Sequence, residues 1–164
     1  MGVRLLENAA WGFDSNCFVC EPGNDRGLRI PFAYDDESQR VTAEFTFGPE
    51  YSGVPRYVHG GIVLAILDEA MAWAAIAMAE RFAVVHQTAT TFDRPVKVGV
   101  AHRVEASVQT SSDTAVTTRA AVIDSDGRRC AEAHARLVVM TPAAASSAIG
   151  DLSDDDARYL RGGP

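Results

Sequence analysis

The triplet His59-Gly60-Gly61 is the first place in the sequence where residue types and spacing indicate chemistry. It stands directly before an apolar run, and the first turn of a helix presents unpaired N–H groups and a partial positive charge. Glycine at such a place lets a ligand approach the backbone closely. N–H groups there would stabilise a carbonyl oxygen that becomes an oxyanion. Taken alone, however, the triplet is explained by a plain turn before a helix.

Two adjacent carboxylates, Asp68 and Glu69, are the charged residues of the apolar run 62–79. A carboxylate in a buried helix needs either a paired partner or a catalytic task. Asp68 follows Gly61 by about two helical turns, so both fall on nearly the same helix face, roughly 10 Å apart. Glu69 is rotated by ~100° from that line and is expected to face another surface, such as a subunit boundary. Structural hydrogen bonds are the alternative explanation for both acids.

The pair Cys17-x-x-Cys20 is typical either of half a zinc site or of a redox motif. A closed zinc site needs about four ligands, a second such pair is missing, and Cys130 lies far away in sequence. The sequence therefore predicts no metal here, only a loop that carries two reduced thiols. It also lacks the GxSxG, GxGxxG, P-loop and HExxH signatures, so no cofactor is expected.

An α+β fold is expected to position these residues. A helix should run from about Gly60 to Glu80, because alanine dominates this stretch and proline is absent from it. A run of strands around a single helix indicates an antiparallel sheet with the helix on one face. Since a flat sheet covers only one side of an apolar helix, the sheet should curl around it or a second subunit should help. Strands are expected at residues 28–34, 41–47, 84–96, 98–109, 114–123 and 129–140.

The two ends of the chain are expected to lie outside this domain. Residues 1–26 are mixed and turn-rich, residues 27–141 form the domain, and residues 142–164 form a flexible tail. Within the tail, PAAASSAIG is expected to be a linker and SDDDARYLRGG a short helix, with Ser153 as its N-cap and Gly162 at its end.

The composition narrows the class of protein further. The 164 residues are 47% hydrophobic and 23% charged, which indicates a globular chain. A net charge of −7 argues against general nucleic-acid binding. Three cysteines and a start unlike a secretory signal favour a reducing, cytoplasmic location. The apolar run reaches the lower limit of a membrane span, but each central carboxylate would cost roughly 2.5–3.5 kcal/mol at a bilayer centre. A buried helix of a soluble protein, without a membrane partner, is the better interpretation.

Three segments together resemble the hotdog-fold acyl-CoA thioesterases, specifically the phenylacetyl-CoA-thioesterase-like (PaaI-type) branch. The segments are NCFVCEPGNDRGLRI, GVPRYVHGGIVLAILDEAMAWA and FDRPV, and the second places an acid nine residues after its histidine. The resemblance covers the chain from about Cys17 to Thr141. It implies a curled six-stranded antiparallel sheet around one long central helix. It also implies homodimers with active sites at the subunit interface, often paired into tetramers.

The resemblance also implies the roles of individual residues. Asp68 stands at the position of the family's catalytic acid, Gly61 at that of its oxyanion N–H with Gly60 beside it, and His59 at that of the residue that shapes the loop. The Ser or Thr that relatives often carry on the next helix turn is missing. Arg56, Arg94 and Lys97 are candidates to meet CoA phosphates, with solvated surface charge as the alternative for each. The residues expected to contact substrate are Arg56, Tyr57, Met71, His86, Thr88 and Arg94.

We therefore expect the chain to hydrolyse an acyl-CoA or aryl-acyl-CoA thioester to the free acid and CoA. The glycine N–H groups would hold the thioester oxygen, and Asp68 would either activate water or attack the carbonyl itself. The alternative is a non-catalytic hotdog module that binds acyl-CoA or a hydrophobic ligand. The missing Ser or Thr favours this alternative, whereas the acid in an apolar helix favours the enzyme.

Overall fold

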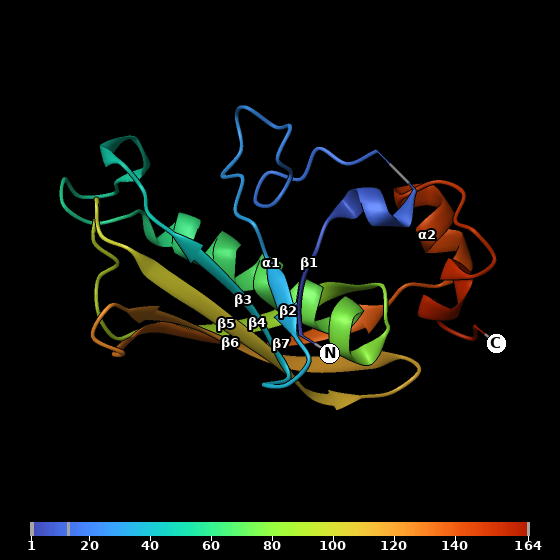
Figure 1. Ribbon diagram of the computed structural model, residues 1–164. Helices are drawn as coiled ribbons and strands as arrows, with labels where there is room; N and C mark the ends of the chain where they lie inside the picture. Colours follow the sequence, from blue (N-terminus) through green and yellow to red (C-terminus); the bar gives the residue numbers. More distant parts are fainter. Residues whose placement is uncertain (1, 13, 164) are drawn as a thin grey trace.

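The computed structural model describes residues 2–12 and 14–163, and over these residues it has one seven-stranded sheet and one long helix (Figure 1). The long helix is α1 (Gly60–Ala79), and a short helix α2 (Pro142–Ala148) lies near the C-terminus. The strands are β1 (Val3–Leu5), β2 (Ala33–Asp35), β3 (Arg40–Phe45), β4 (Ala83–Phe92), β5 (His102–Ser111), β6 (Ala115–Asp124) and β7 (Arg129–Val139). The 3-10 helices are η1 (Asn8–Trp11), η2 (Pro49–Tyr51) and η3 (Asp156–Tyr159).

The strands follow the order β1-β2-β3-β5-β6-β7-β4, and every neighbouring pair is antiparallel. The predicted α+β architecture is therefore confirmed, and the helix and the two hairpins after β4 lie where the sequence predicts them. The sheet has one strand more than expected, because β1 pairs with β2 at one edge. All three residues of β1 are exposed, so it lacks the alternating apolar face by which a strand is recognised.

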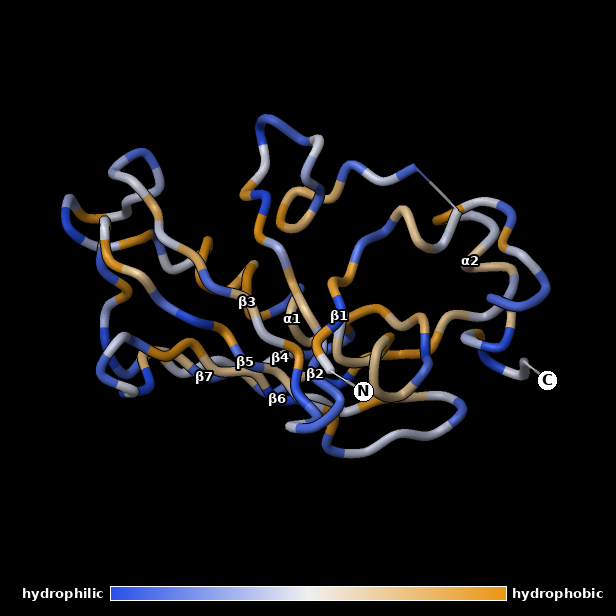
Figure 2. The backbone as a smooth tube through the Cα atoms, viewed as in Figure 1, coloured by the Kyte–Doolittle hydropathy of each residue, from blue (hydrophilic) through white to orange (hydrophobic). Residues whose placement is uncertain are grey.

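Helix α1 forms the centre of the core. Its buried side chains include Val63, Ile66 and Leu67, and it packs against β3, β4, β5, β6 and β7. Among the described residues, α1 is the one helix whose length and hydropathy would also be sufficient to cross a membrane. Here the sheet packs against α1 and buries part of its surface, and the hydrophilic residues lie mostly in the loops around the fold (Figure 2). The helix ends at Ala79 and is capped by Glu80, which adopts the left-handed conformation with a φ of 52°.

The C-terminal tail is more ordered than the sequence predicts. The expected linker forms helix α2. Thr141 is its N-cap, because the Thr141 side chain accepts a hydrogen bond from the Ala144 N–H. Farther on, Ser153 Oγ accepts a hydrogen bond from the Asp156 N–H, 3.2 Å away, at the predicted start of the last helical segment. The prediction of a linker over residues 142–150 is wrong because α2 has something to pack on.

That packing surface is a second, smaller core. Trp11 of η1 contacts Phe82, and their ring centroids lie 5.2 Å apart. Tyr159 of η3 completes the cluster, with its ring centroid 4.9 Å from that of Trp11. Ala145 of α2 is buried in the same cluster. Segment η1 therefore lies beside α2 and η3, next to the C-terminal end of α1 (Figure 1).

Candidate active site

The start of α1 carries one N–H group that is already bonded and one that is free. His59 caps the helix, because its Nδ1 accepts a hydrogen bond from the Gly61 N–H at 2.9 Å. With Nδ1 as acceptor, the neutral ring carries its proton on Nε2. The Gly60 N–H has no hydrogen-bond partner among the described residues. Of the two glycines that the sequence singles out, Gly60 is the one whose N–H is available to a ligand in this conformation.

Backbone hydrogen bonds hold this helix start in place. The His59 N–H donates to the Tyr51 carbonyl at 2.9 Å, and the Val58 N–H donates to the Val96 carbonyl at 2.8 Å. An isolated bridge joins Tyr57 to Lys97. The Gly- and Pro-rich loop before α1 is therefore tied both to η2 and to the segment after β4. This arrangement positions the free Gly60 N–H on a rigid part of the fold.

A cavity of about 280 Å³ opens beside this N–H group. It brings together three residues that the sequence predicts to contact substrate or the oxyanion, Tyr57, Gly60 and Arg94. Phe92 also lines it and is 53% exposed, although the sequence analysis did not assign it a role. Its signal was the aromatic residue of the FDRPV segment. The Arg94 guanidinium donates to the Arg129 carbonyl at 3.1 Å, which fixes its orientation at the rim.

Asp68 is a half-buried carboxylate without a partner. Among the described residues none forms a hydrogen bond or an ion pair with it. Burial raises the pKa of this carboxyl group above its usual range. It lies about two turns along α1 from Gly61 and therefore on nearly the same face of the helix. A carboxylate that is desolvated and unpaired, on a helix whose first N–H group is free, has the properties of a base or a nucleophile.

Glu69 faces the N-terminal loop, not a free surface of the kind we expected. Its Oε1 accepts a hydrogen bond from the Cys17 thiol at 3.3 Å. Burial, followed by the nearby Cys17 sulfur, raises the pKa of Glu69 to about 8. The adjacent Cys20 belongs to the same contact group. The two neighbouring acids of α1 thus have separate surroundings, and Glu69 belongs to a structural contact inside the protomer.

The other predicted substrate contacts lie elsewhere. Arg56 is exposed in the loop before α1, and His86 and Thr88 are exposed on β4, which forms an edge of the sheet. Met71 is fully buried in the main core. None of these four residues lines the cavity at Gly60. The structure therefore brings together only part of the predicted set within one protomer.

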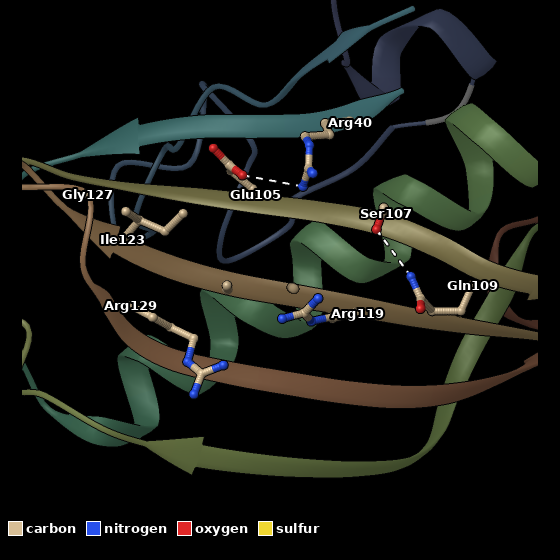
Figure 3. Close-up of a pocket in the computed structure, with 10 residues that line it drawn as sticks. Arg40, Glu105, Ser107, Gln109, Arg119, Ile123, Gly127 and Arg129 are labelled. Carbon is tan, nitrogen blue, oxygen red and sulfur yellow. Dashed lines mark hydrogen bonds and ion pairs between the residues drawn. The ribbon is translucent and has the colours of Figure 1, made fainter. Parts of the chain in front are cut away.

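A larger groove of about 410 Å³ lies on the outer face of the sheet, where Arg40, Arg119 and Arg129 project from β3, β6 and β7 (Figure 3). Each of these arginines already has an acidic partner. Arg40 pairs with Glu105 at 3.4 Å, and Arg119 and Arg129 both pair with Glu132. Since each guanidinium group is held in an ion pair and Gly60 does not line this groove, we do not assign the chemistry to it.

A long apolar helix packed on an antiparallel sheet, with a glycine N–H at its start and an acid two turns later, defines the hotdog class of proteins. Comparison with known families agrees, because residues 56–131 match the thioesterase superfamily. The match covers slightly less than half of the chain, and over this segment the predicted resemblance to the hotdog thioesterases is confirmed. A search of curated proteins found no match.

Solved structures support the same fold. A thioesterase superfamily protein is 21% identical with a TM-score of 0.70, and the match covers 82% of this chain and 66% of that one. A Streptococcus mutans protein bound to acetyl CoA is 16% identical with a TM-score of 0.59, covering 62% and 82%. The E. coli PaaI protein from the phenylacetic acid degradation operon is 17% identical with a TM-score of 0.57, covering 61% and 76%. At these identities the likeness establishes the fold.

Proposed function

We propose that the protein hydrolyses acyl-CoA thioesters to the free acid and CoA. The observation that carries the proposal is the unpaired, half-buried carboxylate of Asp68 on a helix whose first N–H, at Gly60, is also free. A structural acid would have a hydrogen-bond partner, since leaving a buried charge without one is costly. The match of residues 56–131 to the thioesterase superfamily supports the same reaction.

The proposed reaction uses each group for one task. The Gly60 N–H donates to the thioester oxygen and stabilises the negative charge that develops there. Asp68 takes a proton from a water molecule whose oxygen attacks the carbonyl carbon, or attacks that carbon itself to form an anhydride that water then hydrolyses. In both routes CoA leaves as the thiolate. Because burial raises the pKa of Asp68, its carboxylate is a stronger base than an exposed aspartate. Tyr57, Phe92 and Arg94 would line the path of the bound thioester.

The proposal includes a homodimer in which two chains share each site. Gly60 and Asp68 are eight residues apart on α1, which is about 12 Å along the axis, whereas a general base must lie within about 3 Å of the proton it takes, or one water away. A thioester group held at Gly60 is therefore out of reach of Asp68 in the same chain. Edge strand β4 supports a partner, because Val84 and Phe92 on it are 50% and 53% exposed. Pairing of dimers into tetramers remains part of this proposal.

Two structural neighbours support the proposed class of substrate. One structural neighbour is bound to acetyl CoA, and another comes from a phenylacetic acid degradation operon. We extend acyl-CoA or aryl-acyl-CoA recognition to this chain as a proposal. The three free cysteines suit a reducing cytoplasm as its location.

The test is turnover of short, long and aromatic acyl-CoAs, followed by the release of free thiol. We expect hydrolysis of at least one class, and we expect Asp68→Asn to lower kcat while CoA binding persists. If the wild-type chain binds acyl-CoA tightly but hydrolyses no member of the panel, the protein is a binding module and the enzymatic proposal is wrong.

A further inference from the structure

Three ionisable side chains converge where the N-terminal loop meets α1. Cys17, Cys20 and Glu69 each offer one ligand atom, and these atoms all lie within 4.8 Å of one another. The Cys17 sulfur is 3.3 Å from Glu69 Oε1 and 3.4 Å from the Cys20 backbone nitrogen, which donates a hydrogen bond to it. The group therefore combines two thiols and a carboxylate from two distant parts of the chain.

The loop that carries the two cysteines is held by backbone hydrogen bonds. The Glu21 N–H donates to the Cys17 carbonyl at 3.3 Å, so the turn closes on itself. On the far side, the Leu28 N–H donates to the Phe18 carbonyl at 2.7 Å and the Ile30 N–H donates to the Val19 carbonyl at 2.9 Å. The two thiols are thus positioned in advance against α1, as the ligands of a binding site must be.

The group also lacks a positive partner. No Lys, Arg or His of the described residues forms an ion pair with Glu69. Cys20 is buried, and Cys17 and Glu69 are only partly exposed, so water solvates the cluster poorly. Acidic groups gathered in such surroundings are usually paired with a cation or coordinate a metal.

We propose that Cys17, Cys20 and Glu69 bind one zinc ion. Two thiolates and a carboxylate are ligands that Zn²⁺ prefers, with bond lengths of about 2.3 Å to sulfur and about 2.0–2.2 Å to oxygen. Tetrahedral coordination at these lengths separates a sulfur from an oxygen by roughly 3.5 Å, close to the 3.3 Å between Cys17 and Glu69. The fourth position is filled by water.

A neighbouring residue orients the proposed ligands. The Asn8 side-chain amide donates to the Cys20 sulfur at 3.5 Å and to Ser15 Oγ at 3.1 Å. N–H donors from Asn8 and from the Cys20 backbone therefore point at the two sulfur atoms. Such donors stabilise thiolates and hold metal ligands in position. Asn8 is a positioning residue and not a ligand.

This site revises the expectation from the sequence that no metal binds here. That expectation counted two ligands, and it could not include a third from a helix 52 residues farther along the chain than Cys17. The zinc site uses none of the groups assigned to the proposed hydrolysis, because its ligands do not include Asp68 or Gly60. Its role would be to fasten the N-terminal loop to α1.

The experiment measures metal binding by the full reduced chain without any substrate. The metal-free protein is titrated with Co²⁺, whose thiolate complexes absorb strongly in the near ultraviolet, and then with Zn²⁺ in competition with a chromophoric chelator. We expect one metal per chain and loss of the Co²⁺–thiolate band in Cys17→Ser and in Cys20→Ser. Glu69→Gln should weaken binding, and Asn8→Ala should weaken it by about 10–100-fold. Cys130→Ser is the matched control, since this remote thiol on β7 should not affect binding.

A second measurement uses only the wild-type chain, in case a variant does not fold. Zn²⁺ should slow alkylation of Cys17, the more exposed of the two thiols, and a chelator should restore its rate. The zinc site is refuted if metal binds in less than a 1:1 ratio, if the band survives in both single cysteine variants, or if Zn²⁺ does not protect Cys17. A chain that binds no metal but forms a Cys17–Cys20 disulfide would also refute it, in favour of a redox pair.

Discussion

Replacing Gly60 with proline would remove one N–H group and leave the start of the helix intact. Gly60 is the first residue of α1, a position where proline is common because its missing N–H has no partner inside the helix. A proline disfavours the α-helical conformation for the residue before it, and His59 lies outside that region, with φ −57° and ψ 132°. The backbone conformation at this site therefore accepts Gly60→Pro without strain.

The expected effect on rate follows from the role of that N–H. Removal of one oxyanion donor typically lowers kcat by about 10²–10³-fold, which corresponds to about 2.7–4 kcal/mol of transition-state stabilisation. Stability should change little or rise by roughly 0.4–1 kcal/mol, because proline restricts the unfolded chain. A loss of activity without a loss of stability would separate the chemical role of Gly60 from a structural one.

The matched control is Gly60→Ala. A Cβ at Gly60 would meet the Phe92 ring at 3.9 Å, an ordinary van der Waals contact, and the N–H group would remain. We expect this variant to keep kcat within a few-fold of the wild type. The assay is thiol release from the best acyl-CoA, with thermal unfolding followed in parallel. Equal losses in the proline and alanine variants, or full activity of the proline variant, would refute the assignment of the Gly60 N–H.

Three further predictions concern other parts of the molecule. Asp68→Asn should lower kcat by about 10²–10⁴-fold while circular dichroism and the oligomeric state stay unchanged, and near-normal turnover would count against it as the base. Met71→Ala should destabilise the fold by about 2–5 kcal/mol in chemical denaturation, because Met71 is fully buried; a selective rise in KM at unchanged stability would instead make it a substrate contact. Glu132, whose pKa is lowered to about 2 mainly by the hydrogen bond from Arg119, should contribute stability above about pH 4.5 that is lost as the pH falls toward 2. Acid unfolding of Glu132→Gln should therefore depend less on pH over that range, and an unchanged dependence would contradict the assignment.

The parts of the fold that the sequence predicts are those with strong local signals. Helix α1 is a long alanine-rich run without proline, and β5–β7 alternate between buried and exposed residues. Strand β1 was missed because its residues are all exposed, and α2 because its stability depends on packing of Ala145 in the second core. Neither β1 nor α2 has a periodic pattern of apolar residues from which the sequence alone could predict it.

The candidate site likewise has one part that the sequence predicts and another that only the folded structure shows. The spacing of Gly61 and Asp68 is local to one helix, so the sequence predicts that they lie on nearly the same face. Two contacts of the site cannot be predicted from the spacing of residues in the sequence. One is the use of the Gly61 N–H by the His59 ring, which depends on a side-chain rotamer. The other is the contact of Glu69 with Cys17, which joins segments that only the folded chain brings together.

The central claim is that Gly60 of one chain and Asp68 of another form each site, and subunit mixing tests it most directly. Gly60→Pro and Asp68→Asn, each nearly inactive alone, are unfolded together and refolded, and heterodimer formation is checked by native mass spectrometry. In a two-fold symmetric dimer, each heterodimer has one site with both groups intact and one with neither. Random mixing should then restore about a quarter of wild-type activity, since half of the dimers carry one intact site of two. Activity that stays at the level of the two separate variants, with heterodimers present, would contradict the shared site.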